Sequence, residues 1–234
     1  MILRERFGVS FFTSDLITVP HGFSTRLGGV SDAPFDTLNL GSSAVDSGVL
    51  ENYERFAAAV GIQREDFVFT RQVHGDHLEW AENRVLEDCD GLLTRRKNRA
   101  LTVVWADCVP ILLQGENCVA AVHSGWRGTK LNIAAKAVKM MESSKIRAAI
   151  GPCICKKCFE VQNDVACEFP AYAEKISETH WQIDLRDIVK NQLKSAGVSE
   201  IDVSEQCTCC EEKLFFSHRR NGQPRGTHSA VIAL

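Results

Sequence analysis

Apolar residues recur along the chain in two patterns, one with helical spacing and one in short continuous runs. Segment 49–60, VLENYERFAAAV, has helical spacing and is followed by Gly61, a residue type that commonly ends helices. The same spacing predicts helices at 129–142 and 184–196, the second closed by Gly197. Short apolar runs predict strands at 67–73, 101–105, 147–150, 214–217 and 230–234.

Two further apolar runs, 109–114 and 118–122, flank the turn signal GEN and predict a β-hairpin. If the turn consists of Gly115–Glu116, Cys108 lies directly opposite His123, with the two Cβ atoms roughly 5 Å apart. A slip of one residue in this register would turn the strand over. The predicted pairing brings a thiol and an imidazole together at the open end of the hairpin.

The order of these elements predicts the fold class. Strands and helices are interleaved, yet several neighbouring strands read as hairpin pairs, which favours a mixed sheet over a doubly wound parallel one. The sequence contains no internal repeat, low-complexity tract or long Pro/Gly/Ser-rich linker. We therefore expect residues 1–234 to form a single α/β (α+β) domain, long enough to bury a substantial core.

Composition and charge exclude several classes of protein. The chain is 44 % hydrophobic and 24 % charged, as is typical of globular proteins, and carries a net charge of −3. With a pI near 6.2 and no basic stripe, it offers no electrostatic reason to bind nucleic acid. No run of 18 apolar residues occurs, and the N-terminal MILRERFGVSFF lacks a signal-peptide core. We expect a cytoplasmic protein without a membrane partner, and no oligomeric state is predicted.

Ten cysteines are a high number for this length, and six of them form two groups. In a reducing compartment, dense cysteine groups favour metal binding over disulfides. The spacing within CICKKC and CTCC, however, is not interpreted as the regular paired C-x-x-C of a zinc ribbon. The favoured interpretation is small buried residues, and a structural zinc site is the alternative. The two groups are Cys153/Cys155/Cys158 and Cys207/Cys209/Cys210.

Common catalytic motifs are missing from the sequence. It contains neither G-x-G-x-x-G nor G-x-x-x-x-G-K-[ST], the signals of dinucleotide and triphosphate loops. It also lacks G-x-S-x-G and H-E-x-x-H, which removes the commonest serine hydrolases and zinc proteases.

Three residues are candidates for a metal site. His74 lies at the end of a predicted strand, just before Gly75, and joins Cys108 and His123 as two imidazoles and one thiol. Zinc accepts such a set readily, and three protein ligands leave a fourth position open, as in catalytic sites. Without metal, Cys108 and His123 could act as nucleophile and base. Asp107 follows an apolar run, where a carboxylate must be paired or exposed in a cleft.

Two glycine-containing segments are candidates for anion binding. In SGWRGTKLN, Gly125 and Gly128 flank Arg127 just before a predicted helix, where backbone N–H groups and a guanidinium suit phosphate. A plain glycine-rich turn is the competing interpretation. In HGFSTRLGGVS, Arg26 precedes a Gly-Gly turn and is a weaker candidate.

Several blocks spread over nearly the whole chain resemble the YfiH family, also described as laccase-domain or purine nucleoside phosphorylase YfiH-like proteins. Many such blocks in order are more specific than any one motif. They are GFSTRLGGVS, LNLG, RQVHG, CDGLLT, ADCVPILL, AVHSGWRG, IGPCI, FEV and FFSHRRNG.

The resemblance implies a fold, an activity and a metal site. The fold would be a layered α/β sandwich with mixed sheets. The activity would be zinc-dependent phosphorolysis of adenosine, inosine or methylthioadenosine to the base and a (methylthio)ribose 1-phosphate, together with deamination of adenosine. The metal ligands, carried over by motif, would be His74, Cys108 and His123. These are the same three residues that the strand arrangement places together.

The resemblance also implies roles for residues around that centre. Cys108, His123 and Asp107 would be catalytic, with Asp107 acting behind the metal or in proton transfer, or else serving the structure. Arg127 and Arg26 would hold phosphate, and Asn39 belongs to the LNLG block expected to line the pocket. Among modest departures from the family pattern, Trp105 replaces a small residue before ADC, and Phe159 replaces a tyrosine. A change at Trp105 would alter the shape of the pocket.

Two other functions are weighed against this one. The family has also been described as a multicopper polyphenol oxidase, and His₂Cys does resemble a blue-copper ligand set. Only seven histidines are present, however, with no H-x-H pair, and Met140 and Met141 lie on a predicted helix, so copper is the less favoured metal. The other alternative is a Cys/His hydrolase that edits peptidoglycan precursors.

Overall fold

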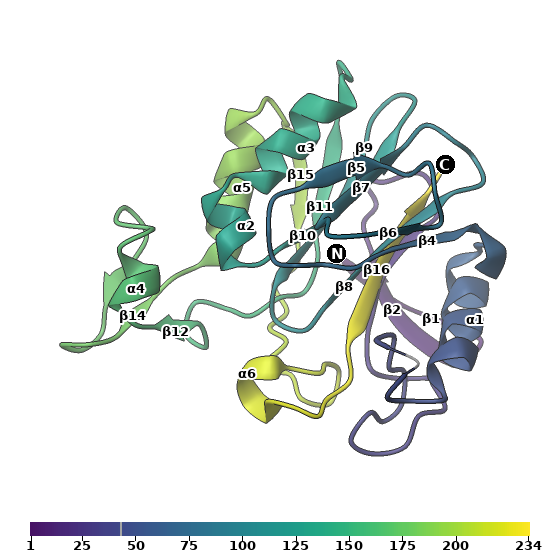
Figure 1. The fold of residues 1–234 in the computed structure, drawn as a ribbon, viewed down its shortest axis with the longest axis horizontal. Helices are drawn as coiled ribbons and strands as arrows, with labels where there is room; N and C mark the ends of the chain where they lie inside the picture. Colours follow the sequence, from purple (N-terminus) through teal and green to yellow (C-terminus); the bar gives the residue numbers. More distant parts are fainter. Residues whose placement is uncertain (43) are drawn as a thin grey trace.

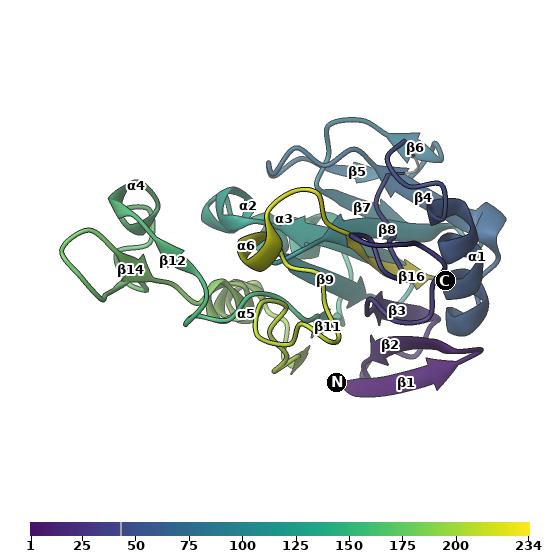
Figure 2. The same ribbon diagram turned by 90° about the horizontal axis from the view of Figure 1, so that it is seen from below.

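The computed structural model describes residues 1–42 and 44–234, whose secondary structure is arranged in four layers (Figures 1 and 2). Two β-sheets face each other, and helices cover the outer face of each. The first sheet has seven strands, in the order β1 (Ile2–Arg6), β2 (Val9–Thr13), β3 (His21–Ser24), β16 (His228–Ala233), β8 (Ala100–Trp105), β4 (Phe67–Thr70) and β6 (Val85–Leu86). The second has six, in the order β15 (Glu200–Val203), β11 (Arg147–Ile150), β9 (Val109–Gln114), β10 (Val119–Ser124), β7 (Gly91–Thr94) and β5 (Leu78–Trp80).

Helices complete the two outer layers. Helix α1 (Val49–Val60) packs on the seven-stranded sheet, while α3 (Ile133–Met141) and α5 (Leu185–Ser195) pack on the six-stranded sheet (Figure 1). A small third sheet projects from the body with α4 (Asn163–Ala166). Its strands are β12 (Glu160–Val161), β14 (Trp181–Gln182) and β13 (Glu174–Lys175). The remaining short helices are α2 (Trp126–Lys130), α6 (His218–Asn221) and the 3₁₀ turn η1 (Arg64–Asp66).

The apolar composition of the central strands follows from these layers. In β9, Ile111 and Leu113 pack into the cluster under α3 and α5, while Leu112 points into the cluster between the two sheets. Because successive side chains of a strand alternate between faces, a strand covered on both sides is apolar throughout. This is why 109–114 reads as a continuous apolar run.

Parallel and antiparallel pairs occur in both large sheets. Strand β4 is parallel to β8 and β6, and β11 is parallel to β15, while β9, β10 and β16 pair antiparallel with their neighbours. The predicted α/β sandwich with mixed sheets is therefore confirmed. None of the helices in the described residues is long and apolar enough to cross a membrane.

Several predicted elements are confirmed and others are wrong. Helix α1 has the predicted bounds, and Gly61 ends it with a φ of +84°. The predicted helix 129–142 is wrong as one unit, because Asn132 adopts a φ of +63° and separates α2 from α3. The predicted strand 67–73 ends at Thr70, and no strand forms at 214–217. His74 therefore lies in a loop rather than at the end of a strand.

The predicted register of the β9–β10 hairpin is also wrong, by two residues. The Gly115 N–H donates to the carbonyl of Cys118 at 2.8 Å, so these residues face each other across Glu116–Asn117, and His123 pairs with Pro110. A shift of two residues keeps the same side chains on the same face, since strands have a period of two. Cys108, two residues before Pro110, therefore still lies beside His123.

Candidate functional site

Three side chains from three separate segments converge at one end of the six-stranded sheet. His74 comes from the loop after β4, Cys108 immediately precedes β9, and His123 lies near the end of β10. One nitrogen of each imidazole and the Cys108 sulfur all lie within 4.8 Å of one another. The two rings are nearly perpendicular, at 89°, with their centroids 4.9 Å apart. The structure thus brings the three candidate ligands together.

A buried carboxylate, Asp90, holds this arrangement from behind. Its Oδ1 atom lies 2.8 Å from His123 Nδ1 and accepts the backbone N–H of His74 at 3.0 Å. Its Oδ2 atom accepts the backbone N–H groups of Gly75 and Val73 at 2.8 and 3.2 Å. Because Asp90 occupies Nδ1 of His123, the Nε2 atom of that ring is left for a ligand. Asp90 therefore fixes both the ring of His123 and the loop that carries His74.

The absence of a side chain at Gly125 lets the cluster close. A Cβ atom built at Gly125 would lie 3.2 Å from both Cys108 Sγ and His74 Cδ2. Contacts this short require a neighbour to move, so glycine is the residue that this packing tolerates best. His74 itself has a φ of +59°, a strained conformation for a non-glycine residue that the three hydrogen bonds of its loop to Asp90 stabilise.

The charges of the cluster favour a thiolate. Burial opposes ionisation of Cys108, but the charge of His123 and hydrogen bonds from His123 and His74 lower its pKa from 9.0 to about 6. Burial likewise opposes a charge on His123, yet Cys108 and Asp90 raise its pKa to about 9. Burial also opposes ionisation of Asp90, and its hydrogen bonds from His123 and the backbone outweigh that effect and lower its pKa. In the absence of metal, Cys108 and His123 therefore form a thiolate–imidazolium pair.

This donor set fits a zinc ion. Two imidazole nitrogens and one thiolate are typical zinc ligands, and a carboxylate behind a ligating histidine is a recurrent supporting contact in such sites. Copper also accepts two histidines and one cysteine. With three ligands from the protein, a bound ion would keep a fourth position for substrate or water.

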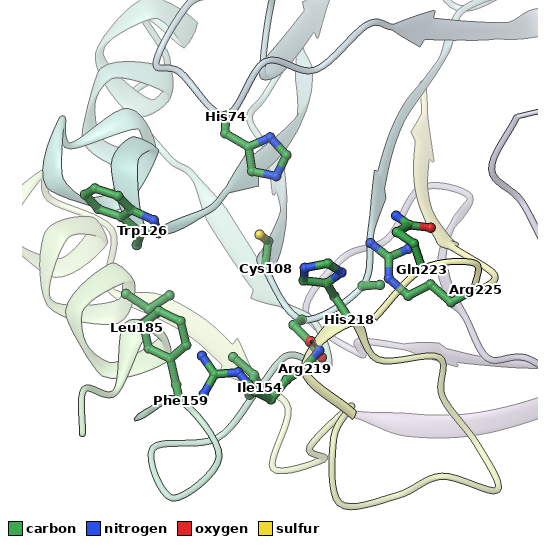
Figure 3. Close-up of a pocket in the computed structure, with 12 residues that line it drawn as sticks. His74, Cys108, Trp126, Ile154, Phe159, Leu185, His218, Arg219, Gln223 and Arg225 are labelled. Carbon is green, nitrogen blue, oxygen red and sulfur yellow. Dashed lines mark hydrogen bonds between the residues drawn. The ribbon is translucent and has the colours of Figure 1, made fainter. Parts of the chain in front are cut away.

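The pocket beside the cluster has a volume of about 390 Å³, within the roughly 300–1,000 Å³ of small-molecule sites. Figure 3 shows two contrasting walls, with Cys108 and His74 between them. One wall is apolar and carries two aromatic rings. It consists of Trp126, Ile154, Phe159 and Leu185. The other wall is polar and comes from the C-terminal segment. It consists of His218, Gln223 and Arg225, while the Arg219 guanidinium reaches across to Phe159, with its carbon 5.6 Å from the ring centroid.

Arg225 is the most enclosed charge of the polar wall. Its Nη1 atom donates to the carbonyl of Gly226 at 3.3 Å, while its Nε is buried without a hydrogen-bond partner among the described residues. Burial lowers the pKa of this guanidinium, whereas the negative charges of Asp107 and Cys108 raise it. A buried guanidinium with an unused donor is typical of an anion site.

Asp107 reaches the pocket, but both of its carboxylate oxygens are engaged. Oδ1 accepts from Thr208 Oγ1 at 2.7 Å, and Oδ2 accepts from Ser217 Oγ at 3.1 Å and the Arg219 N–H at 2.7 Å. Its φ of +92° places the residue in a strained turn just before Cys108. These contacts favour a positioning role, since three donors hold the carboxylate in place.

The other three predicted substrate residues do not line this pocket in the described structure. Arg26 is held by Asp36, whose Oδ2 accepts its Nη2 at 2.8 Å. Asn39 is buried and joins its own loop to Thr227, whose N–H it accepts at 2.9 Å. Arg127 is exposed and stacks on the far side of Trp126, with its guanidinium carbon 4.3 Å from the ring centroid.

Sequence reasoning assigned no role to several residues that the structure places at the site. Asp90 is the main one, and its signal was a carboxylate in CDGLLT just before an apolar run. The basic residues of HRRNGQPR, which supply the polar wall, formed the strongest local charge cluster of the C-terminal segment. Trp105, expected to shape the pocket, instead packs between Phe23 and His228 in the core.

The fold is a layered α/β sandwich, and its pocket contains a cluster of two histidines and one cysteine. These features define a class of proteins: α/β sandwiches with a candidate metal centre in a small-molecule pocket. Comparison with known proteins then gives the family: the chain belongs to the family described as multi-copper polyphenol oxidoreductase laccase, which matches residues 20–234 and includes the YfiH-type proteins. A purine nucleoside phosphorylase of Deinococcus radiodurans is 36 % identical over 97 % of this chain and 94 % of its own. The purine nucleoside phosphorylase YlmD of Geobacillus stearothermophilus is 34 % identical over 91 % of this chain and 88 % of its own.

Solved structures agree with this assignment. The hypothetical protein YfiH of Bacillus licheniformis superposes with a TM-score of 0.92 at 31 % identity, covering 99 % of this chain and 98 % of its own. The YlmD structure from Geobacillus stearothermophilus superposes with a TM-score of 0.90 at 31 % identity, covering 98 % and 97 %. The predicted membership of the YfiH family is therefore confirmed.

Proposed function

We propose that this chain is a purine nucleoside phosphorylase that uses zinc held by His74, Cys108 and His123. The observation that carries the proposal is the position of this cluster between an aromatic wall and an arginine wall in one pocket. Relatives over nearly the full chain are named purine nucleoside phosphorylase, which supports the same activity.

The two walls match the two parts of the reaction. Trp126 and Phe159 offer flat rings on which a purine base stacks, and Arg225 and Arg219 offer the charge that holds phosphate. A phosphate oxygen forms a bond to the anomeric carbon of the ribose as the bond from that carbon to the purine nitrogen breaks. The electron pair of the broken bond passes to the base, which takes up a proton. The products are the free purine and ribose 1-phosphate.

When bound, zinc supplies Lewis-acid polarisation of an oxygen in its open position. Asp90 keeps His123 in the tautomer whose Nε2 faces the cluster. Gly125 and Trp126 close the pocket over Cys108, and Asp107 fixes the turn that presents it. His218, which lines the polar wall, would give the departing purine its proton.

The same pocket accounts for the further activities expected of this family. Adenosine and inosine differ only at the purine 6-position, and methylthioadenosine carries an apolar thioether that the wall of Ile154 and Leu185 accommodates. Deamination of adenosine places purine C6, rather than the anomeric carbon, near the cluster. The chain would then act on small-molecule purine nucleosides, with phosphate as the second substrate of phosphorolysis.

Product analysis with and without phosphate tests this proposal. Purified wild-type protein and His123→Ala are incubated with adenosine, and the products are separated by chromatography while zinc is measured in the same samples. Adenine with ribose 1-phosphate, formed only with phosphate and lost in the variant, is the expected result. Inosine formed without phosphate reports deamination. If folded, zinc-loaded protein releases no free purine with phosphate from adenosine, inosine or methylthioadenosine, the proposal is wrong.

A second candidate function rests on the Cys108–His123 pair. A thiol whose pKa is lowered to about 6 beside an imidazole held by a carboxylate is also the arrangement of a cysteine nucleophile. The chain would then be a hydrolase that cleaves an amide in a peptidoglycan precursor. Such a hydrolase keeps its activity after chelation and loses it on alkylation, whereas the zinc enzyme loses activity on chelation and regains it with zinc.

A further inference from the structure

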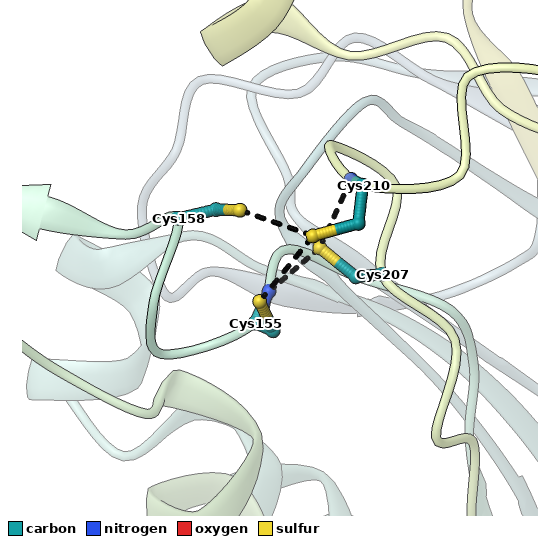
Figure 4. Close-up of side chains that lie close together, drawn as sticks. All are labelled: Cys155, Cys158, Cys207 and Cys210. Atoms are coloured by element: carbon teal, nitrogen blue, oxygen red, sulfur yellow. Dashed lines mark hydrogen bonds between the residues drawn. The ribbon is translucent and has the colours of Figure 1, made fainter.

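A second cysteine cluster lies away from the pocket cluster, between two loops that are distant in sequence. The sulfur atoms of Cys155, Cys158, Cys207 and Cys210 all lie within 4.8 Å of one another (Figure 4). Cys158 and Cys210 are 3.3 Å apart and Cys155 and Cys210 are 4.0 Å apart, measured between Sγ atoms. All four are free thiols, and the closest sulfur pair exceeds the roughly 2.05 Å of a disulfide.

The spacing of these cysteines is that of two paired motifs. Cys155-Lys-Lys-Cys158 and Cys207-Thr-Cys-Cys210 are both C-x-x-C, so the interpretation that these blocks lack the paired spacing is wrong. Two C-x-x-C turns that face each other provide the four thiolates of a structural zinc site. Cys153 and Cys209, the remaining members of the two blocks, lie outside the cluster.

Two backbone hydrogen bonds already have a cysteine sulfur of this cluster as their acceptor. The N–H groups of Cys155 and Cys210 both point at Cys207 Sγ, at 3.3 and 3.4 Å. Donors aimed at a sulfur stabilise its thiolate form and orient it, as contacts behind metal ligands generally do. Cys207 is thus held from two loops before any metal is considered.

Burial in the core does not explain the cluster. Only Cys207 is buried, Cys155 and Cys158 are half-buried and Cys210 is exposed. Burial of small apolar side chains stabilises a fold. Two half-buried thiols and one exposed thiol contribute little of this stabilisation. Four clustered thiols in a reducing compartment, three of them half-buried or exposed, are better explained by a shared ligand.

The charges around the cluster suit a dianionic complex. A divalent ion with four thiolates carries a net charge of −2, and Lys156 and Lys157 lie within the first turn. Arg220 Nη1 donates to the carbonyls of Thr208 and Cys209 at 2.8 and 2.7 Å, which adds a positive charge beside the second turn. The carboxylate of Glu211, which accepts the Cys207 N–H at 2.9 Å, is the acidic group in contact with this turn.

We propose that Cys155, Cys158, Cys207 and Cys210 bind one zinc ion in a closed, four-thiolate structural site. Because all four ligands come from the protein, the site has no open position and no catalytic step of its own. It is independent of the ion in the pocket, and it would exist whichever reaction the pocket performs.

The proposed ion would join two loops that contribute to the pocket or support it. The first loop carries Ile154 and Phe159, and the second carries Thr208, whose hydroxyl holds Asp107 at 2.7 Å. Arg219 of α6 already links the first loop to the polar wall, since its Nη1 donates to the carbonyl of Cys158 at 2.9 Å. A metal that joins the loops therefore keeps the aromatic wall and the arginine wall at a constant separation.

Metal analysis of a variant with a disabled pocket site tests the proposal. Protein carrying Cys108→Ala and His123→Ala is purified under reducing, anaerobic conditions, and its zinc is measured beside the wild type. The expected result is one zinc per chain in the double variant. A folded double variant without zinc would overturn the proposal.

Single substitutions assign that zinc to the cluster. In the double variant, Cys155→Ser and Cys210→Ser are each expected to remove the remaining ion and to lower the melting temperature. Cys209→Ser, in the same turn but outside the cluster, is the matched control and keeps the ion. Full zinc content in Cys155→Ser and in Cys210→Ser would contradict the assignment.

Cobalt provides a readout that does not depend on variants in the cluster. The double variant loaded with Co²⁺ is expected to show intense thiolate-to-metal charge-transfer bands, whose strength reports the number of sulfur ligands. Weak bands would overturn the proposal. An intact mass of the native protein that is lower by two hydrogen atoms per disulfide would also overturn it, because it would show that the cysteines are oxidised. This spectrum decides the matter even if a cysteine variant fails to fold.

Discussion

Replacement of the buried Asp90 by asparagine tests how the pocket cluster is held. In the wild type, the two carboxylate oxygens of Asp90 accept four donors: three backbone N–H groups, of Val73, His74 and Gly75, and the ring of His123. Asparagine has nearly the same shape but only one acceptor oxygen, and its amide group donates. In the variant, the amide N–H₂ group of the asparagine must therefore face N–H groups that are themselves donors.

Either orientation of the asparagine carries a cost. If the amide nitrogen replaces Oδ2, it faces the N–H groups of Val73 and Gly75, and two hydrogen bonds to a charged acceptor are lost. At about 1.5–3 kcal/mol each, the free energy of unfolding falls by about 3–6 kcal/mol. If the nitrogen replaces Oδ1, it faces His74 and forces the proton of His123 onto Nε2, which can then no longer bind metal.

Loss of a carboxylate behind a ligating histidine typically weakens metal binding about 10–100-fold, or about 1.4–2.7 kcal/mol. We expect Asp90→Asn to show both effects, measured by urea unfolding of the metal-free protein and by zinc competition titration. Asp88→Asn is the matched control, since Asp88 is exposed, pairs with Arg71 at 3.0 Å and adopts a φ of +54° that asparagine tolerates. Zinc affinity and stability equal to the wild type in Asp90→Asn would refute the reasoning.

Three further predictions concern the cluster and the pocket. Gly125→Ala places a methyl group 3.2 Å from Cys108 Sγ, and we expect weaker zinc binding in calorimetry; unchanged affinity would show that the cluster can expand. In metal-free protein, the pKa of Cys108, lowered to about 6, makes the thiolate the dominant form above that pH and the thiol below it. Alkylation of Cys108, mapped by peptide mass, should therefore rise with a midpoint near pH 6 and shift upward in His123→Ala; equal midpoints would contradict the pairing. Arg225→Ala should raise the KM for phosphate about 10–100-fold, the equivalent of one charge-assisted hydrogen bond of about 1.5–3 kcal/mol, while changing the KM for nucleoside little; equal effects on both would place Arg225 elsewhere in the reaction.

The fold was largely predictable because the chain signals its elements locally. Helix 49–60 has both a periodic apolar face and a terminal glycine, so its bounds were predicted correctly. Helix 129–142 was predicted as one unit because nothing local marks Asn132 as left-handed. The left-handed conformation of Asn132 changes the direction of the chain, so that α2 lies next to the pocket cluster while α3 packs on the six-stranded sheet.

The hairpin illustrates the limit of pairing rules. Its turn could be centred on Gly115–Glu116 or on Glu116–Asn117, and the Gly115–Cys118 hydrogen bond selects the second. The error was harmless for the site, because a shift of two residues leaves Cys108 and His123 on one face. An error of one residue would have separated them.

The clustering of the three candidate ligands was predictable, and the residues that surround them were not. His74, Cys108 and His123 are chemically distinctive, and each lies in a recognisable block. Asp90 was missed because its role depends on a loop more than ten residues away that closes around its carboxylate. Arg26 and Asn39 were assigned to the pocket by block alone, whereas the structure uses both to hold loops.

Stepwise return of zinc to metal-stripped protein tests whether phosphate-dependent purine release requires zinc in the pocket cluster. The folded protein is freed of pocket metal, zinc is added in increments, and the phosphate-dependent release of purine is measured at each step. The account predicts negligible purine release before zinc is added and a rate that rises in proportion to zinc bound at His74, Cys108 and His123. Purine release at full rate from the metal-free, folded protein would contradict it.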